Sequence, residues 1–183
     1  MVQAGLRRYW GEQAARRGWI VISPVAPTGT SFFSGGERVI PELLDAVAAE
    51  FAIETGRFHL AGASNGGRSA FRVAIRHPER FRSMTVLPGM PPTPGDSRQL
   101  ARLAAIPVTM FVGGADQPWL EGSRAALAGL EASGATATLS VLDGEGHVPP
   151  SLDGEVIMTH LDAVRSRLNA AREAGDAPTG AGP

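Results

Sequence analysis

A serine flanked by glycines stands at a position typical of nucleophilic catalysis. The segment Gly62-Ala63-Ser64-Asn65-Gly66 has the pattern G-x-S-x-G. A short apolar run over residues 57–62 predicts a strand before it, and residues 65–76 have a helical pattern after it. In this setting the serine occupies a strained turn that exposes its hydroxyl, and glycines at 62 and 66 avoid crowding by a Cβ. The pattern therefore predicts Ser64 as a nucleophile, against the alternative of a glycine-rich turn without chemistry.

The same residues almost match a phosphate-binding loop. Gly62 to Ser69 fits G-x-x-x-x-G-K-[ST], except that Arg68 replaces the lysine. The planar guanidinium is a poor substitute for a compact ammonium between phosphates. No apolar run ends directly in an acid that would hold magnesium, because Asp116 is separated from its run by three residues. A nucleotide site is therefore the weaker interpretation.

A serine hydroxyl needs a base, and His147 is the best placed of the four histidines. It lies in a glycine-rich loop, residues 143–150, directly after an expected strand. Parallel sheets place their ligand sites at this end of the strands. His59 falls within a strand, His77 precedes a proline at a helix end and His160 lies inside a helix. These three are expected to be structural.

An acid must orient that base, and Asp116 follows the expected strand 107–112. Its alternative role is to cap the helix near Trp119. Asp96, after another strand, is a second option, while Asp143 and Glu145 are expected to shape the loop. The chain order serine, acid, histidine then corresponds to that of the α/β-hydrolases.

Strands alternate with helices along the chain, which predicts an α/β fold whose mostly parallel sheet has helices on both faces. The expected strands cover residues 19–23, 57–62, 83–87, 107–112 and 136–142. The expected helices cover residues 40–51, 65–76, 119–132 and 156–168. One domain over residues 1–170 and a disordered tail over 171–183 are expected.

Composition excludes several classes of function. The 183 residues carry a net charge of −1, which argues against nucleic-acid binding. There is no cysteine for a disulfide or thiolate metal site, and no lysine for Schiff-base chemistry. No apolar run reaches the ~20 residues of a membrane helix, and the first residues lack the pattern of a signal peptide. A cytoplasmic protein is expected, although a longer parent protein would be open to export.

Three stretches together resemble a known family. FHLAGASNGGRSAFRVAIRHPERF, IPVTMFVGGADQPW and LDGEGHVPP are similar to serine esterases of the α/β-hydrolase fold. The nearest branch is the phospholipase/carboxylesterase or polyhydroxybutyrate-depolymerase-like group, over roughly residues 10–170. The resemblance implies Ser64 as nucleophile, Asp116 as acid and His147 as base. It also implies an oxyanion hydrogen bond from the backbone N–H of Asn65, and no cofactor or metal.

The resemblance also points to missing parts. In the family another strand lies between those expected here at 19–23 and 57–62, and nothing in residues 1–18 supplies it. The loop with the second oxyanion donor is missing too. An N-terminally truncated hydrolase is therefore expected. A genuinely short protein that pairs the two strands directly or borrows one, or a non-catalytic remnant, stays open.

The expected reaction is hydrolysis of a small-molecule carboxylic ester through an acyl-enzyme. Met90, in the loop 88–97, and Trp119 are candidates for the substrate pocket, with a core or surface role as the alternative for each. An inactive fold remnant or interaction module is the contrasting hypothesis, and a peptidase of the prolyl-oligopeptidase type is a weaker one. The sequence leaves the natural substrate and the oligomeric state open.

Overall fold

The computed structural model describes residues 6–176, which form two compact units by their internal contacts. The larger unit is Val25–Pro149. The smaller unit combines the described residues before Val25 with those from Pro150 onward. The contacts within the chain thus distinguish two parts, and one domain over residues 1–170 stays a prediction. The residues expected to carry chemistry all lie in the larger unit.

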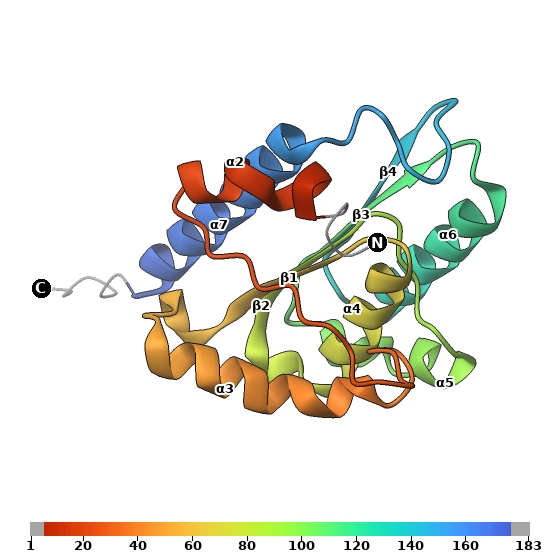
Figure 1. Ribbon diagram of the computed structural model, residues 1–183. Helices are drawn as coiled ribbons and strands as arrows, with labels where there is room; N and C mark the ends of the chain where they lie inside the picture. Colours follow the sequence, from red (N-terminus) through yellow and green to blue (C-terminus); the bar gives the residue numbers. More distant parts are fainter. Residues whose placement is uncertain (1–5, 177–183) are drawn as a thin grey trace, which may run out of the picture. The chain divides into compact units, whose positions relative to one another are not determined.

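A parallel sheet of four strands forms the centre of the larger unit (Figure 1). The strands are β1 (Phe58–Gly62), β2 (Phe81–Val86), β3 (Val108–Gly113) and β4 (Ala137–Leu142). Their order in the sheet is the order in the chain, so each strand pairs with the next. The last residues of neighbouring strands are in register, Gly62 with Val86 and Gly113 with Leu142. The carboxyl ends therefore meet at one edge, and the expected α/β class with a parallel sheet is confirmed.

Helices connect the strands and pack on the sheet. α4 (Asn65–Arg76) joins β1 to β2 and contacts both, and α6 (Gln117–Ala132) joins β3 to β4 in the same way. Right-handed crossovers that step in one direction place such connecting helices on one face. The other helical segments of this unit are η2 (Gly36–Val39), α3 (Ile40–Glu50), η3 (Glu54–Gly56), η4 (Pro78–Arg80), α5 (Pro94–Ser97) and η5 (Leu100–Leu103).

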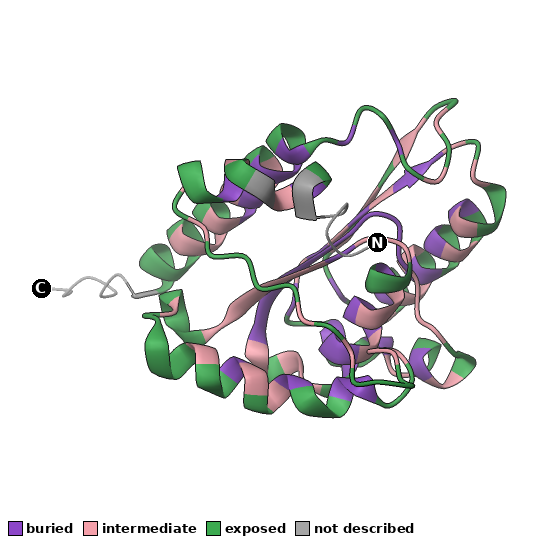
Figure 2. Cartoon of the chain, in the orientation of Figure 1, coloured by how far each residue is buried: buried purple, intermediate pink, exposed green. Residues whose placement is uncertain are grey.

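The core of this unit lies between the sheet and these helices. All six residues of β2 are buried, as the purple strand in Figure 2 shows. Phe71 and Ile75 of α4 pack there with Met84 and Met110 of the strands, all four fully buried. Each such side chain contributes about 1.5–3 kcal/mol relative to leaving it exposed. α4 ends at Arg76 because Pro78 has no N–H to continue it.

The smaller unit is built from η1 (Leu6–Trp10), α2 (Gly11–Arg16) and α7 (Gly154–Asp176). Arg17 donates a hydrogen bond of 2.7 Å to Asp162 of α7, and the indole N–H of Trp19 donates one of 2.8 Å to the same carboxylate. Burial raises the pKa of Asp162, but these two hydrogen bonds and the nearby charges of Arg17 and Arg165 outweigh it and hold that pKa below its ordinary value. Arg17 also pairs with Glu155. These contacts attach the segment after α2 to α7.

The strand expected over residues 19–23 does not form, so this prediction is wrong. Residues 19–27 have no regular secondary structure. Ile20, Val21 and Ile22 are 58%, 40% and 38% exposed. An apolar run becomes a strand only where a neighbouring strand takes up its backbone hydrogen bonds, and the described residues pair none with this segment. The run itself carries no information about such a partner.

The C-terminal prediction is wrong in part. α7 continues to Asp176, so residues 171–176 are helical rather than disordered. Alanine, arginine and glutamate in this stretch are good helix formers, which explains the extension. Residues 177–183 of the expected tail lie outside the described residues. Among residues 6–176, no helix combines the length and apolarity needed to cross a membrane.

Candidate active site

Ser64 occupies a sharp turn between strand and helix. β1 ends at Gly62 and α4 begins at Asn65. The backbone of Ser64 has φ 56° and ψ −117°, a conformation that residues other than glycine rarely adopt and that costs about 1–3 kcal/mol. A Cβ on Gly62 would lie 2.2 Å from the carbonyl oxygen of Gly66, so only glycine permits this close approach of strand and helix. The local geometry is that of the turn expected from the motif.

The second glycine that the turn requires is Gly67 rather than Gly66. A Cβ on Gly66 would meet nothing within 4 Å, so the prediction that this position avoids crowding is wrong. A Cβ on Gly67 would lie 2.2 Å from the carbonyl oxygen of Pro88 and 2.7 Å from the Cα of Gly89. α4 thus begins in direct contact with the segment that follows β2. Two adjacent glycines, Gly66 and Gly67, are the sequence signal for such a close contact. The sequence does not show which of the two faces the segment after β2.

His147 lies within hydrogen-bond distance of both expected partners. It stands in the loop after β4, and its Nε2 is 2.8 Å from the hydroxyl oxygen of Ser64. Its Nδ1 is 2.6 Å from Oδ2 of Asp116, in the turn after β3. The side chain of Asp116 is 13% exposed and that of His147 is 39% exposed. The structure therefore brings the three side chains into one chain of contacts, with the carboxylate shielded and the imidazole open to solvent.

Two loops at the sheet edge are joined by their backbones. Gly114 donates a hydrogen bond of 2.8 Å to the carbonyl of Leu142, and Ala115 donates one of 2.8 Å to the carbonyl of Glu145. A Cβ on Gly113 would lie 2.1 Å from the carbonyl oxygen of Gly146. This contact was not foreseen from the sequence. It positions Asp116 beside the loop that carries His147.

Asp96, the second candidate for the acid, has partners other than the imidazole. Asp96 is 2% exposed and accepts hydrogen bonds from Arg72 at 2.8 Å and from the hydroxyl of Thr93 at 2.5 Å. Asp143 is exposed in the loop. Asp116 precedes α6, but its side chain makes no capping hydrogen bond there. Position and contact therefore both favour Asp116 over the alternatives.

The remaining histidines lie elsewhere. His59 on β1 is 2.6 Å from the hydroxyl of Ser83 on β2, a contact between neighbouring strands. His77 follows the last residue of α4, and its backbone N–H donates to the carbonyl of Val73 at 2.9 Å. His160 is half-buried on α7 of the smaller unit. Each position agrees with the structural role expected of it.

The two pocket candidates have different surroundings. The ring centroid of Trp119 lies 5.2 Å from that of His147, with the rings tilted by 49°. Trp119 therefore borders the site. Met90 packs against the core, and a Cβ on Gly122 of α6 would lie 2.1 Å from its sulfur. That contact favours the core role that is the alternative for Met90.

The start of α4 offers a backbone donor beside Ser64. The N–H of Ser64 itself donates to the carbonyl of Pro88 at 3.0 Å. Asn65 is the first residue of α4, where a backbone N–H has no acceptor within the helix. The positive end of the helix dipole adds to the favourable field for an anion at this point.

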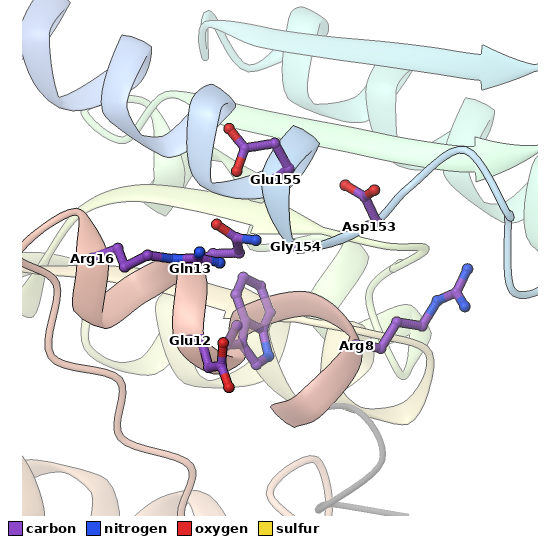
Figure 3. A pocket seen from close by; sticks show the side chains of 8 residues that line it. Arg8, Glu12, Gln13, Arg16, Asp153, Gly154 and Glu155 are labelled. Atoms are coloured by element: carbon purple, nitrogen blue, oxygen red, sulfur yellow. The ribbon is translucent and has the colours of Figure 1, made fainter.

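Two further observations concern other sites. Within residues 6–176, no group of histidine, aspartate and glutamate side chains is arranged to hold a metal ion. The smaller unit has an open pocket of about 390 Å³ (Figure 3). Its walls are formed by Arg8, Trp10, Glu12, Gln13, Arg16, Asp153, Gly154 and Glu155. It contains neither a serine nor a histidine, so it offers no second nucleophile and base.

Comparisons with known proteins bear on the fold and on part of the sequence. Residues 33–94 match the family model "Esterase", described as "Putative esterase". A protein from Bacillus cereus ATCC 10987, described as uncharacterized, has a TM-score of 0.74 at 15% identity over 91% of this chain. A carboxylesterase from Mesorhizobium loti has a TM-score of 0.57 at 20% identity over 69% of this chain. The Bacillus cereus carboxylesterase has a TM-score of 0.56 at 25% identity over 68% of this chain. No curated protein matches the chain significantly.

The chain spans only part of these structures. It covers 56% of the first Bacillus cereus protein, 59% of the Mesorhizobium loti enzyme and 57% of the Bacillus cereus carboxylesterase. At these identities the likeness concerns the fold. The chain thus has an α/β-hydrolase-like fold, and it resembles the esterases, whose family model matches residues 33–94.

Proposed function

We propose that this chain hydrolyses carboxylic esters through an acyl-enzyme formed on Ser64. The single observation that carries the proposal is the continuous contact from the Ser64 hydroxyl through His147 to Asp116, at 2.8 Å and 2.6 Å. A hydroxyl becomes a useful nucleophile when an adjacent base, itself oriented by a third group, removes its proton.

The proposed reaction proceeds in two halves. Ser64 Oγ attacks the ester carbonyl while Nε2 of His147 takes its proton, and the same proton then passes to the departing alcohol. Water, activated by His147, next attacks the acyl group on Ser64 and releases the acid. Asp116 accepts the hydrogen bond from Nδ1–H throughout, which holds the tautomer and stabilises the imidazolium.

The negative charge of each tetrahedral intermediate needs donors. The backbone N–H of Asn65 is proposed as one, because it is unused within the helix and follows the nucleophile directly. The positive end of α4 adds to it. One such donor typically contributes about 10²–10³-fold in rate.

The family match supports the proposal independently of the geometry. Its residues 33–94 include Ser64 but stop before Asp116 and His147. The two partners therefore owe their assignment to the resemblance of their own segments and to the contacts in the structure. The carboxylesterase structures that share the fold agree with the same reaction class.

A fluorophosphonate probe tests the proposal directly. The purified chain is expected to be labelled and to hydrolyse p-nitrophenyl esters, and Ser64→Ala is expected to lose both while its circular dichroism stays unchanged. Ser69→Ala is the matched control, because that hydroxyl is held by the carbonyl of Asn65 at 2.8 Å. A folded wild-type chain that neither reacts with the probe nor turns over any ester would favour an inactive remnant or interaction module.

A further inference from the structure

Arg68 lies one helical turn after the proposed nucleophile. Its backbone N–H donates to the carbonyl of Ser64 at 3.1 Å. Helical side chains lean toward the N-terminus and cover the turn that precedes their own Cα. Arg68 therefore lies in the first turns of α4, next in the chain to the turn that holds Ser64 and Asn65.

Contacts from two loops hold this guanidinium in place. Its central carbon lies 4.7 Å from the centroid of the Phe33 ring, a cation–π contact. One of its terminal nitrogens donates to the carbonyl of Pro92 at 3.2 Å. Phe33 precedes η2, and Pro92 belongs to the segment after β2 whose Pro88 carbonyl binds the N–H of Ser64. The cation is thus held between the segment that contains Phe33 and the segment that follows β2.

The charge of Arg68 has no acid beside it. Among the described residues no acid forms an ion pair with Arg68, in contrast to Arg17, Arg72, Arg80 and Arg82. Arg72, one turn further along α4, pairs with Asp96 at 2.8 Å and lies 3.8 Å from Glu37. Guanidinium has five N–H donors, and the carbonyl of Pro92 takes only one of those on Arg68.

We propose that Arg68 binds a carboxylate on the substrate, so that the preferred esters are anionic. The proposal rests on the ester hydrolysis proposed above and names the substrate class for that site. A guanidinium that is oriented in advance and has no acid partner is suited to a carboxylate, which it can bind through two parallel hydrogen bonds. The positive end of α4 favours the same charge.

The position of Arg68 in the chain guides the choice of probe. Arg68 follows Ser64 by four residues, and its backbone N–H donates to the carbonyl of Ser64. The carboxylate is therefore proposed to lie a few methylene groups from the scissile carbonyl. Hemiesters of short dicarboxylic acids are the probes of choice.

The experiment compares two esters, one with a free distal carboxylate and one in which that carboxylate is methylated. Mono-p-nitrophenyl glutarate carries a free carboxylate, and p-nitrophenyl methyl glutarate masks it. For the wild-type chain the kcat/KM of the anionic ester is expected to exceed that of the neutral one at least tenfold, because hydrogen bonds to charged groups contribute more than neutral ones. The ratio is expected to fall with added salt.

Three variants show whether Arg68 causes the preference. Arg68→Gln is expected to bring the ratio to about one, and Arg68→Lys to keep part of it. Arg76→Gln removes the same charge from an exposed position at the far end of α4 and is expected to leave the ratio unchanged. A wild-type ratio near one, or an equal loss of both activities in Arg68→Gln, overturns the proposal and leaves Arg68 as a structural contact. Hydrolysis of the neutral ester decides separately whether the proposed function itself holds.

Discussion

Gly113 and Gly146 lie so close that a Cβ on the first would come within 2.1 Å of the carbonyl oxygen of the second. The contact joins the end of β3 to the loop after β4. Asp116 stands three residues after Gly113, and His147 follows Gly146 directly. The 2.6 Å contact between their side chains therefore depends on two backbones that have no side chain between them.

Substitution of Gly113 is expected to uncouple the acid from the base. Gly113→Ala must push the two loops apart, which costs about 1–3 kcal/mol of stability and lengthens the Asp116–His147 contact. Esterase activity, measured as kcat with a p-nitrophenyl ester, is expected to fall at least tenfold. Gly146→Ala is the control, because a Cβ there meets nothing within 4 Å. Equal activity in the two variants would show that the close contact is unimportant.

The role of Asp116 is tested by changing its charge and not its shape. Asp116→Asn leaves the size of the side chain intact but favours the wrong imidazole tautomer, so kcat is expected to fall about 10³–10⁴-fold. Asp143→Asn, an exposed acid of the histidine loop, is expected to stay within twofold of the wild type. Loss of activity in the Asp143 variant alone would transfer the orienting role to that residue.

The buried pair of Arg72 and Asp96 is expected to matter for stability rather than chemistry. Asp96→Ala leaves a 13%-exposed guanidinium without its closest acceptor, and loss of one partner of a buried pair costs about 3–5 kcal/mol. Asp45→Ala breaks the exposed pair with Arg80 and is expected to cost less than about 1 kcal/mol. Urea titration followed by circular dichroism measures both. A small effect of Asp96→Ala would mean that the neighbouring Glu37 compensates.

The smaller unit is expected to lose stability in mild acid because of His160. Burial, with a smaller contribution from the charge of Arg167, lowers the pKa of His160 below 6.5. The unfolded chain then binds a proton that the folded chain resists, so the free energy of unfolding decreases as the pH falls below 6.5 toward the folded pKa. At lower pH, the lowered pKa of Asp162 acts in the same direction, because the stability it contributes is lost as that carboxylate is protonated below 3.8.

Melting temperatures at pH 7.5 and pH 5 measure this dependence. His160→Gln removes the titrating ring and is expected to show a smaller decrease in Tm than the wild type. His77→Gln, at the end of α4 in the other unit, serves as the comparison. An identical decrease in all three proteins would place the acid sensitivity elsewhere.

Local patterns in the sequence were enough for much of this fold. Four of the five expected strands form, and α4 has the expected bounds of 65–76. The spacing of apolar residues, and the glycines and prolines that end an element, are properties of neighbouring residues. They can therefore be recognised without the rest of the chain. The failure at residues 19–23 has the opposite origin, since a strand depends on a partner that is distant in sequence.

The candidate active site, too, was determined in part by the sequence and in part by the tertiary structure. The sequence by itself determined the types of group present and the turn at Ser64, because the motif and its flanking elements are contiguous. It left Asp96 and Asp116 both open as the acid and could not tell Gly66 from Gly67. Only the tertiary structure placed Asp96 on Arg72, Asp116 on His147 and Gly67 against Pro88. The physical reason is that hydrogen bonds and close backbone contacts act over a few ångströms, so they depend on how separate loops pack at the edge of the sheet.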